Sequence, residues 1–302
     1  MRKDFAMSEY VLISDSASDI DEKQVADWDT PIIPINYYIN DKIYENKPDH
    51  SEFPVPEFYS TIKNGAKVST SAVNTVAFID FFTVYLKQGK DILYISFSSG
   101  LSATYQNALS AAFELKEYYP DRKIEIVDSL CASFGQGLLV YLCAMKKKAG
   151  ASLEEVRDYA ESMKLRICHE FTVDDLGQLK RGGRISSASA FFGSMLQIKP
   201  MLFVDNDGKL AAYEKVRGRK IAVKKIADMI AGEISDDLYP IFISHGDCTD
   251  DVNEFISLIK EKFPDRECVV NYIGPVIGAH SGYKTLAVFC VGESRGVARM
   301  KN

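Results

Sequence analysis

Hydrophobic residues in the first half of the chain form short continuous runs that alternate with amphipathic stretches. The continuous runs predict buried β-strands over residues 10–14, 31–38, 92–97 and 124–127. The amphipathic stretches predict helices over residues 56–63, 76–87, 103–117 and 134–148. Because strands that alternate with helices usually form a parallel sheet covered on both faces, the pattern predicts an α/β domain.

The pattern changes after about residue 168. Residues 198–204 and 209–216 predict two strands joined by an Asp-Asn-Asp-Gly turn, and an amphipathic helix follows them. Further strands are predicted over residues 241–244, 267–273 and 286–291. We therefore expect a two-domain α/β protein with a ligand in the interdomain cleft. The N-terminal domain is a parallel sheet flanked by helices in residues 1–167, and the C-terminal domain is a mixed α+β sheet in residues 168–302.

Polar side chains follow the predicted strands of the first half, at Asp15, Ser98, Ser99, Asp128 and Ser129. Ligands of open α/β sheets bind outside the carboxyl ends of the strands. The Ser-Ser-Gly turn at 98–100 offers hydroxyls, backbone N–H groups and a helix dipole to a carboxylate or phosphate. The same serines could instead cap the helix, and the hydroxyl-rich run at 68–71 has the same two interpretations.

Two basic segments and one histidine are the other candidates for binding chemistry. The segment at 179–186 places two glycines among cations, and 215–220 repeats the basic pattern. Arginine offers a planar donor fork to phosphate or carboxylate, so these segments are either a docking patch or a solvated basic edge. His280 lies beside Ser281 in a glycine-rich segment, predicted as a loop, from which it could reach a ligand.

Composition narrows the class of protein. The chain has 302 residues, is 46% hydrophobic and carries a net charge of −6 without a long basic run, so nucleic acid is not expected as a partner. Its 6 cysteines show no metal-binding spacing, which favours free thiols in a reducing cytoplasm over disulfides or zinc. Without a long apolar stretch or a signal sequence, we expect a cytoplasmic protein with no stable membrane insertion.

Several short motifs, taken in order, resemble the DegV family of fatty-acid-binding proteins. They are SDSASD at 14–19, VSTS at 68–71, ISFSSGLSATYQNA at 95–108, VDSLCASFGQG at 127–137, LGQLKRGGRIS at 176–186, IKPML at 198–202, VRGRK at 216–220 and GPVIGAHSG at 274–282. Residues 72–74 and 283–284 depart from what is usual in the family. The resemblance covers nearly the whole chain.

The resemblance implies a lipid-binding protein rather than an enzyme, with one long-chain fatty acid buried between two domains and no cofactor. It implies that the carboxylate is held by Thr70 and Ser99, with Ser98 and His280 near the headgroup. Arg184, Arg217 and Arg219 are implied at the headgroup or at a partner-docking surface. Some members are the binding subunit of a bacterial fatty acid kinase, where a separate ATP-binding subunit makes an acyl phosphate for phospholipid synthesis.

An acyl tail needs an apolar tunnel, since each buried methylene contributes about 0.8 kcal/mol. The candidate lining residues are Phe191, Phe192, Met195, Leu196 and Ile198, although the same stripe could be ordinary core.

Two other functions remain open. A serine esterase could use Ser99 and His280 with Asp15 or Asp128, of which Asp128 fits the usual hydrolase order, but the Gly-x-Ser-x-Gly elbow of such enzymes is missing. A phosphate-ligand enzyme has less support, because neither GxGxxG nor GxxxxGK[ST] occurs.

Overall fold

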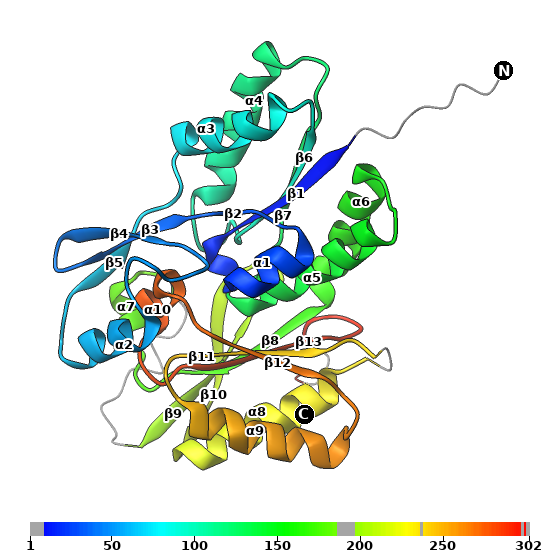
Figure 1. The fold of residues 1–302 in the computed structure, drawn as a ribbon. Helices are drawn as coiled ribbons and strands as arrows, with labels where there is room; N and C mark the ends of the chain where they lie inside the picture. The colour runs from blue at the N-terminus through cyan, green and yellow to red at the C-terminus, as the bar shows by residue number, and fades with distance from the viewer. Residues whose placement is uncertain (1–8, 186–196, 236–237, 297–298, 300–302) are drawn as a thin grey trace.

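Three β-sheets and the helices around them form the structure, a computed structural model that describes residues 9–185, 197–235, 238–296 and 299 (Figure 1). The N-terminal half supplies a four-stranded sheet (sheet A) and a three-stranded sheet (sheet B). The C-terminal half supplies a six-stranded sheet (sheet C). The mixed α/β architecture predicted from the sequence is confirmed. The domain boundary at 167/168 stays a prediction, although sheet C begins at Ile167.

Sheet A is parallel throughout, in the order β2-β1-β6-β7. Its strands are β1 (Tyr10–Asp15), β2 (Ile32–Ile33), β6 (Asp91–Ser96) and β7 (Ile124–Asp128). Side chains alternate across the sheet. Leu12 packs in the core with helices α5 (Phe134–Lys148) and α6 (Leu153–Met163), while Val11 packs with α3 (Thr75–Leu86) and α4 (Thr104–Tyr118). Both faces are therefore covered, as a parallel sheet requires.

Sheet B is a small antiparallel sheet in the order β4-β3-β5. It consists of β3 (Ile35–Ile39), β4 (Lys42–Asn46) and β5 (Val68–Thr70), and helix α2 (Val55–Lys63) lies between β4 and β5 in the chain. The predicted strand at 31–38 is thus divided between two sheets, β2 in sheet A and β3 in sheet B. Pro34, which lacks a backbone N–H, lies at the break.

Sheet C has the order β10-β9-β8-β13-β11-β12, and only the β11–β12 pair is parallel. Its strands are β8 (Ile167–Thr172), β9 (Ile198–Val204), β10 (Leu210–Arg217), β11 (Ile241–His245), β12 (Cys268–Tyr272) and β13 (Leu286–Val291). Helices α8 (Arg219–Glu233) and α9 (Thr249–Lys262) cover one face, and α5 packs on the other (Figure 1).

The remaining helices are short. They are η1 (Ser16–Ser18), α1 (Glu22–Trp28), η2 (Lys164–Arg166), α7 (Gly177–Arg181) and α10 (Pro275–Ser281). Helix α10 corrects the expectation of a loop at 273–282: Pro275 occupies the first turn, where its missing N–H costs nothing, and Gly282 ends the helix at φ 84°. Within the described ranges, every helix is too short or too polar to span a bilayer.

Candidate functional site

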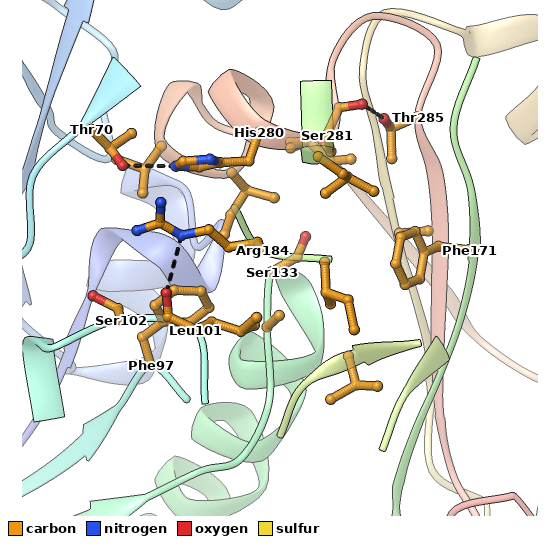
Figure 2. Close-up of a pocket in the computed structure, with 18 of the residues that line it drawn as sticks. Thr70, Phe97, Leu101, Ser102, Ser133, Phe171, Arg184, His280, Ser281 and Thr285 are labelled. Carbon is orange, nitrogen blue, oxygen red and sulfur yellow. Dashed lines mark hydrogen bonds between the residues drawn. The ribbon is translucent and has the colours of Figure 1, made fainter. Parts of the chain in front are cut away.

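A pocket lies where the two halves of the chain meet, with a cavity of about 80 Å³. Its wall is largely apolar. The apolar lining comprises Ile35, Ala72, Phe97, Leu101, Ala132, Phe171, Leu179, Val204, Leu210, Ile273, Val276, Ile277, Ala287 and Phe289. Figure 2 shows Thr70, His280, Arg184 and Ser102 gathered on one side of the pocket and Phe171 on the other. An apolar wall with polar groups at one end suits an amphiphile with a single polar head.

Thr70 and His280 meet at the polar end, although they lie far apart in the sequence. Thr70 Oγ1 lies 2.8 Å from His280 Nε2. Thr70 ends strand β5 at the edge of sheet B, and His280 lies in the last turn of α10. The backbone N–H of Gly274, the N-cap of α10, donates to the Asp19 carboxylate at 2.9 Å and joins α10 to the N-terminal half. The pair brings together two of the residues predicted at the headgroup.

The local geometry of the basic segment at 179–186 requires glycine at two positions, 182 and 183. A Cβ on Gly182 would lie 2.3 Å from His280 Nδ1, so only glycine lets this turn approach the imidazole. Gly183 has φ 68°, in the left-handed region that favours glycine. The close turn brings Arg184 to the pocket, where its Nε donates to the Leu101 carbonyl at 3.3 Å.

The imidazole of His280 is neutral near pH 7. Burial and the neighbouring Arg184 charge lower its pKa from 6.5 to about 4. Its Nδ1 is buried without a hydrogen-bond partner among the described residues, and so is Ser281 Oγ, which also lines the pocket. Unpaired buried polar atoms are uncommon in native proteins. The Nδ1 atom faces Gly182, whereas Ser281 Oγ belongs to a residue of the pocket lining and is open to a ligand or water.

Among the serines at 98–102, Ser102 lines the pocket, and Ser98 and Ser99 do not. Ser98 is fully buried, and its hydroxyl donates to the Gly208 carbonyl at 2.8 Å, which ties the β9–β10 turn to sheet A. Ser99 is exposed and lies outside the pocket lining. Ser102 lines the pocket, and its hydroxyl lies 2.9 Å from Thr104 Oγ1. The Ser-Ser-Gly turn therefore positions the following serine.

The Asp15 carboxylate, at the end of β1, stabilises the backbone that leads into the Ser-Ser-Gly turn. It accepts hydrogen bonds from the Tyr94 hydroxyl at 2.6 Å and from the backbone N–H groups of Phe97 at 2.8 Å and Ala17 at 3.0 Å. Gln136 Nε2 adds a fourth donor at 3.2 Å. Burial raises the pKa of Asp15, and these hydrogen bonds counteract the rise. Asp15 thus has a structural role, because the donors to its carboxylate are all groups of the protein.

A second hollow lies outside the polar end and has a volume of about 460 Å³. It shares Thr70, Arg184 and His280 with the pocket and adds the cations Lys67 and Arg181. The polar end of the pocket is therefore also part of a basic surface depression.

The other predicted residues have different positions. Phe191, Phe192, Met195 and Leu196 lie outside the described residues. Ile198 is half-buried at the start of β9, and like Arg217 and Arg219 it lies outside the pocket lining. Arg217 is exposed on the edge strand β10, and Arg219 Nε pairs with Asp251 at 2.9 Å. Their docking role stays a prediction.

The apolar lining that sequence reasoning missed comes mainly from strands and strand ends. Phe171 of β8 and Phe289 of β13 lie on one face of sheet C, and Phe97 follows β6. Strand β13 reads as a continuous apolar run without a period that marks the pocket face, and β8 mixes polar with apolar residues, so neither sequence points to a pocket.

The geometry does not favour the esterase alternative. His280 Nε2 is paired with Thr70, and the Asp128 carboxylate accepts the backbone N–H groups of Ser99 and Leu130, both at 3.1 Å. A nucleophilic serine needs its hydroxyl on a base and that base on a carboxylate. Here Asp128 shapes a turn.

Comparisons with known proteins agree over most of the chain. A family model described as an uncharacterised protein of the DegV family matches residues 9–293. A DegV domain-containing protein of Clostridium perfringens is 43% identical over 290 residues, 96% of this chain and 99% of its own. The crystal structure of DegV, a fatty acid binding protein from Bacillus subtilis, is 28% identical with a TM-score of 0.78, covering 94% of this chain and 99% of that one. A fatty acid binding DegV family protein from Streptococcus agalactiae is 26% identical with a TM-score of 0.83, covering 95% of this chain and 100% of that one.

Proposed function

The chain belongs to the DegV family, and from this we propose that it binds one long-chain fatty acid in the pocket between its two halves. The carboxylate lies among Thr70, Ser102, His280 and Arg184, and the acyl tail lies against the apolar wall. The observation that carries the proposal is that Thr70, Ser102, Arg184 and His280 gather at one end of a largely apolar pocket. Relatives of similar fold whose names state fatty acid binding support it.

The polar end suits a carboxylate for a physical reason. A buried carboxylate protonates unless donors compensate its lost hydration. Hydroxyl donors at Thr70 and Ser102 and the guanidinium of Arg184 supply that compensation. Neutral His280 can donate from one ring nitrogen without adding a second fixed charge. The tail then adds about 0.8 kcal/mol for each methylene removed from water.

The test is to identify the bound lipid and to block its site. Mass spectrometry of lipid extracted from gently purified protein should show a fatty acid at close to one per chain. Ala72→Phe places a ring at a half-buried position of the lining and should abolish calorimetric binding of oleate and palmitate. Purified protein without acyl lipid that also fails to bind either acid would refute the proposal.

We further propose that the chain presents the bound carboxylate to a separate ATP-dependent fatty acid kinase subunit. The depression outside the polar end supports this role, because it reaches the residues proposed for the carboxylate from the surface and is lined by Lys67 and Arg181. Incubation with such a kinase subunit, ATP and oleate should yield acyl phosphate, trapped as the hydroxamate. Lys67→Glu and Arg181→Glu should reduce the yield without changing oleate affinity. Product formed equally well without this chain would contradict the role.

A further inference from the structure

A cluster of two thiols and one carboxylate is buried on the other face of sheet C from the pocket. Cys168 of β8 and Cys290 of β13 are direct cross-strand partners, and Glu233 is the last residue of α8. One potential ligand atom from each lies within 4.8 Å of the other two. Cys168 and Cys290 are each 1% exposed, and Glu233 is 4% exposed. Such a group resembles the ligand set of a thiophilic cation more than an ordinary apolar core.

The carboxylate of Glu233 is the charged element of this cluster. Neither of its oxygens has a partner at close hydrogen-bond distance among the described residues, and Arg299, the Cys168 thiol and the Gly296 backbone N–H are the groups that stabilise its charge. The nearest cation, Arg299 Nη1, is 3.6 Å from Oε1, and the same nitrogen forms a closer ion pair with Glu170. The C-terminal end of a helix also carries a partial negative charge. Glu233 is therefore a buried acid at a position that favours a cation.

The sheet brings the thiols to this acid. Successive residues of β8 point to opposite faces, so His169 and Phe171 line the pocket while Cys168 packs in the core beneath α8. Gly292 adds the necessary space, because a Cβ there would lie 2.8 Å from Cys168 Sγ. The cluster is thus separate from the fatty acid site but built on the same strands.

We propose that Cys168, Cys290 and Glu233 form a binding site for a thiophilic divalent cation, with Zn²⁺ as the natural occupant. Two thiolates and a carboxylate oxygen are ligands that zinc accepts, and they supply three of the four positions of a tetrahedral site. Zn–S and Zn–O distances near 2.3 and 2.0 Å require the three side chains to close in slightly from their present spacing. Each thiol releases its proton to solvent when the cation binds.

A disulfide between the two cysteines explains the cluster less well. It would remove the thiol proton that Cys168 offers to the Glu233 carboxylate, and it would need an oxidant. A cation neutralises the carboxylate and both thiolates together. Loss of one direct ligand should weaken affinity more than loss of an outer hydrogen-bond partner, which costs about 10- to 100-fold.

The test uses the full chain, reduced and stripped with a chelator. Zn²⁺ titrated in competition with a chromogenic chelator should bind at one equivalent, and Co²⁺ should give a thiolate-to-cobalt charge-transfer band. Cys290→Ser and Glu233→Gln should each weaken Zn²⁺ binding at least 100-fold. Cys143→Ser, at a buried cysteine of α5, should leave it unchanged.

X-ray absorption at the zinc edge needs no variant and covers the case in which a substitution prevents folding. The zinc-loaded chain should show two sulfur neighbours at about 2.3 Å. A shell of nitrogen and oxygen alone, or reduced protein that binds no zinc at one equivalent, would overturn the proposal. Oleate affinity should be the same with and without Zn²⁺, so this result is independent of the fatty acid proposal.

Discussion

Replacement of Ser102 by alanine tests whether the carboxylate lies where the structure places the polar end of the pocket. The Ser102 hydroxyl lines the pocket, whereas Ser99 is exposed and outside it. The two serines are three positions apart in the same turn, so Ser99→Ala is a matched control. Only Ser102→Ala removes a donor from the proposed headgroup site.

The expected magnitude follows from the charge of the ligand. A hydrogen bond to a charged group contributes about 1.5–3 kcal/mol, so Ser102→Ala should raise the dissociation constant for oleate about 10- to 150-fold. Ser99→Ala should change it less than about twofold. Thr70→Val should resemble Ser102→Ala, and the double variant should be non-additive because both hydroxyls serve one carboxylate.

Isothermal titration calorimetry with oleate measures these constants, and methyl oleate provides a ligand of similar shape without the charge. The effect of Ser102→Ala should largely disappear with the methyl ester. Circular dichroism melting must show that each variant is folded. If Ser99→Ala weakened oleate binding while Ser102→Ala did not, the placement of the headgroup would be wrong.

Three further predictions concern stability. The His280 pKa falls from 6.5 to about 4 on folding, so the unfolded chain binds more protons than the folded chain between these pH values. The free energy of unfolding should therefore fall as the pH falls from 6.5 to 4. His280→Gln should flatten this pH dependence in urea titrations, and an unchanged slope would contradict the pKa assigned to His280. Asp15→Asn should cost about 1–3 kcal/mol in urea unfolding by leaving a buried donor unpaired, and a neutral result would show that the carboxylate is dispensable. Gly208→Ala should destabilise the chain more than Gly65→Ala. Both glycines have positive φ, but of the two only Gly208 would place a Cβ against another side chain, 2.1 Å from Ser98 Oγ. Equal losses of unfolding free energy in the two variants would exclude the clash.

The arrangement of the first half could be predicted from the sequence because local patterns carry most of it. Helix α5 begins and ends at the predicted residues, β6 differs from prediction by one residue at each end, and β7 differs by one residue at its C-terminal end. A buried parallel strand needs a continuous apolar run, and its covering helices need one apolar face, so both patterns are visible locally. The order of the motifs predicted the family, which the family model and relatives confirm.

The choice of serine could not be predicted, because a distant contact decides it. Ser98 follows β6, and its local sequence predicts a hydroxyl that is free to bind a ligand. Its hydroxyl is instead satisfied by the Gly208 carbonyl, which comes from a turn in the other half of the chain. That contact leaves Ser102 as the serine of this turn that faces the pocket. Local sequence shows which donors exist, while tertiary packing determines which of them are free.

Strand β8 makes the same point for both proposed sites. Its six residues are all buried, and its sequence, ICHEFT, places Ile, His and Phe on one face and Cys, Glu and Thr on the other, but it does not show which face meets the pocket. Antiparallel pairing with β13 sets Cys168 opposite Cys290 and His169 opposite Phe289. A shift of one residue would exchange the faces, sending the thiol toward the lipid pocket and the imidazole toward α8. Cysteine spacing along the chain argued against a metal site, but spacing is informative only when ligands are close in sequence. Here the register of two strands brings the ligands together.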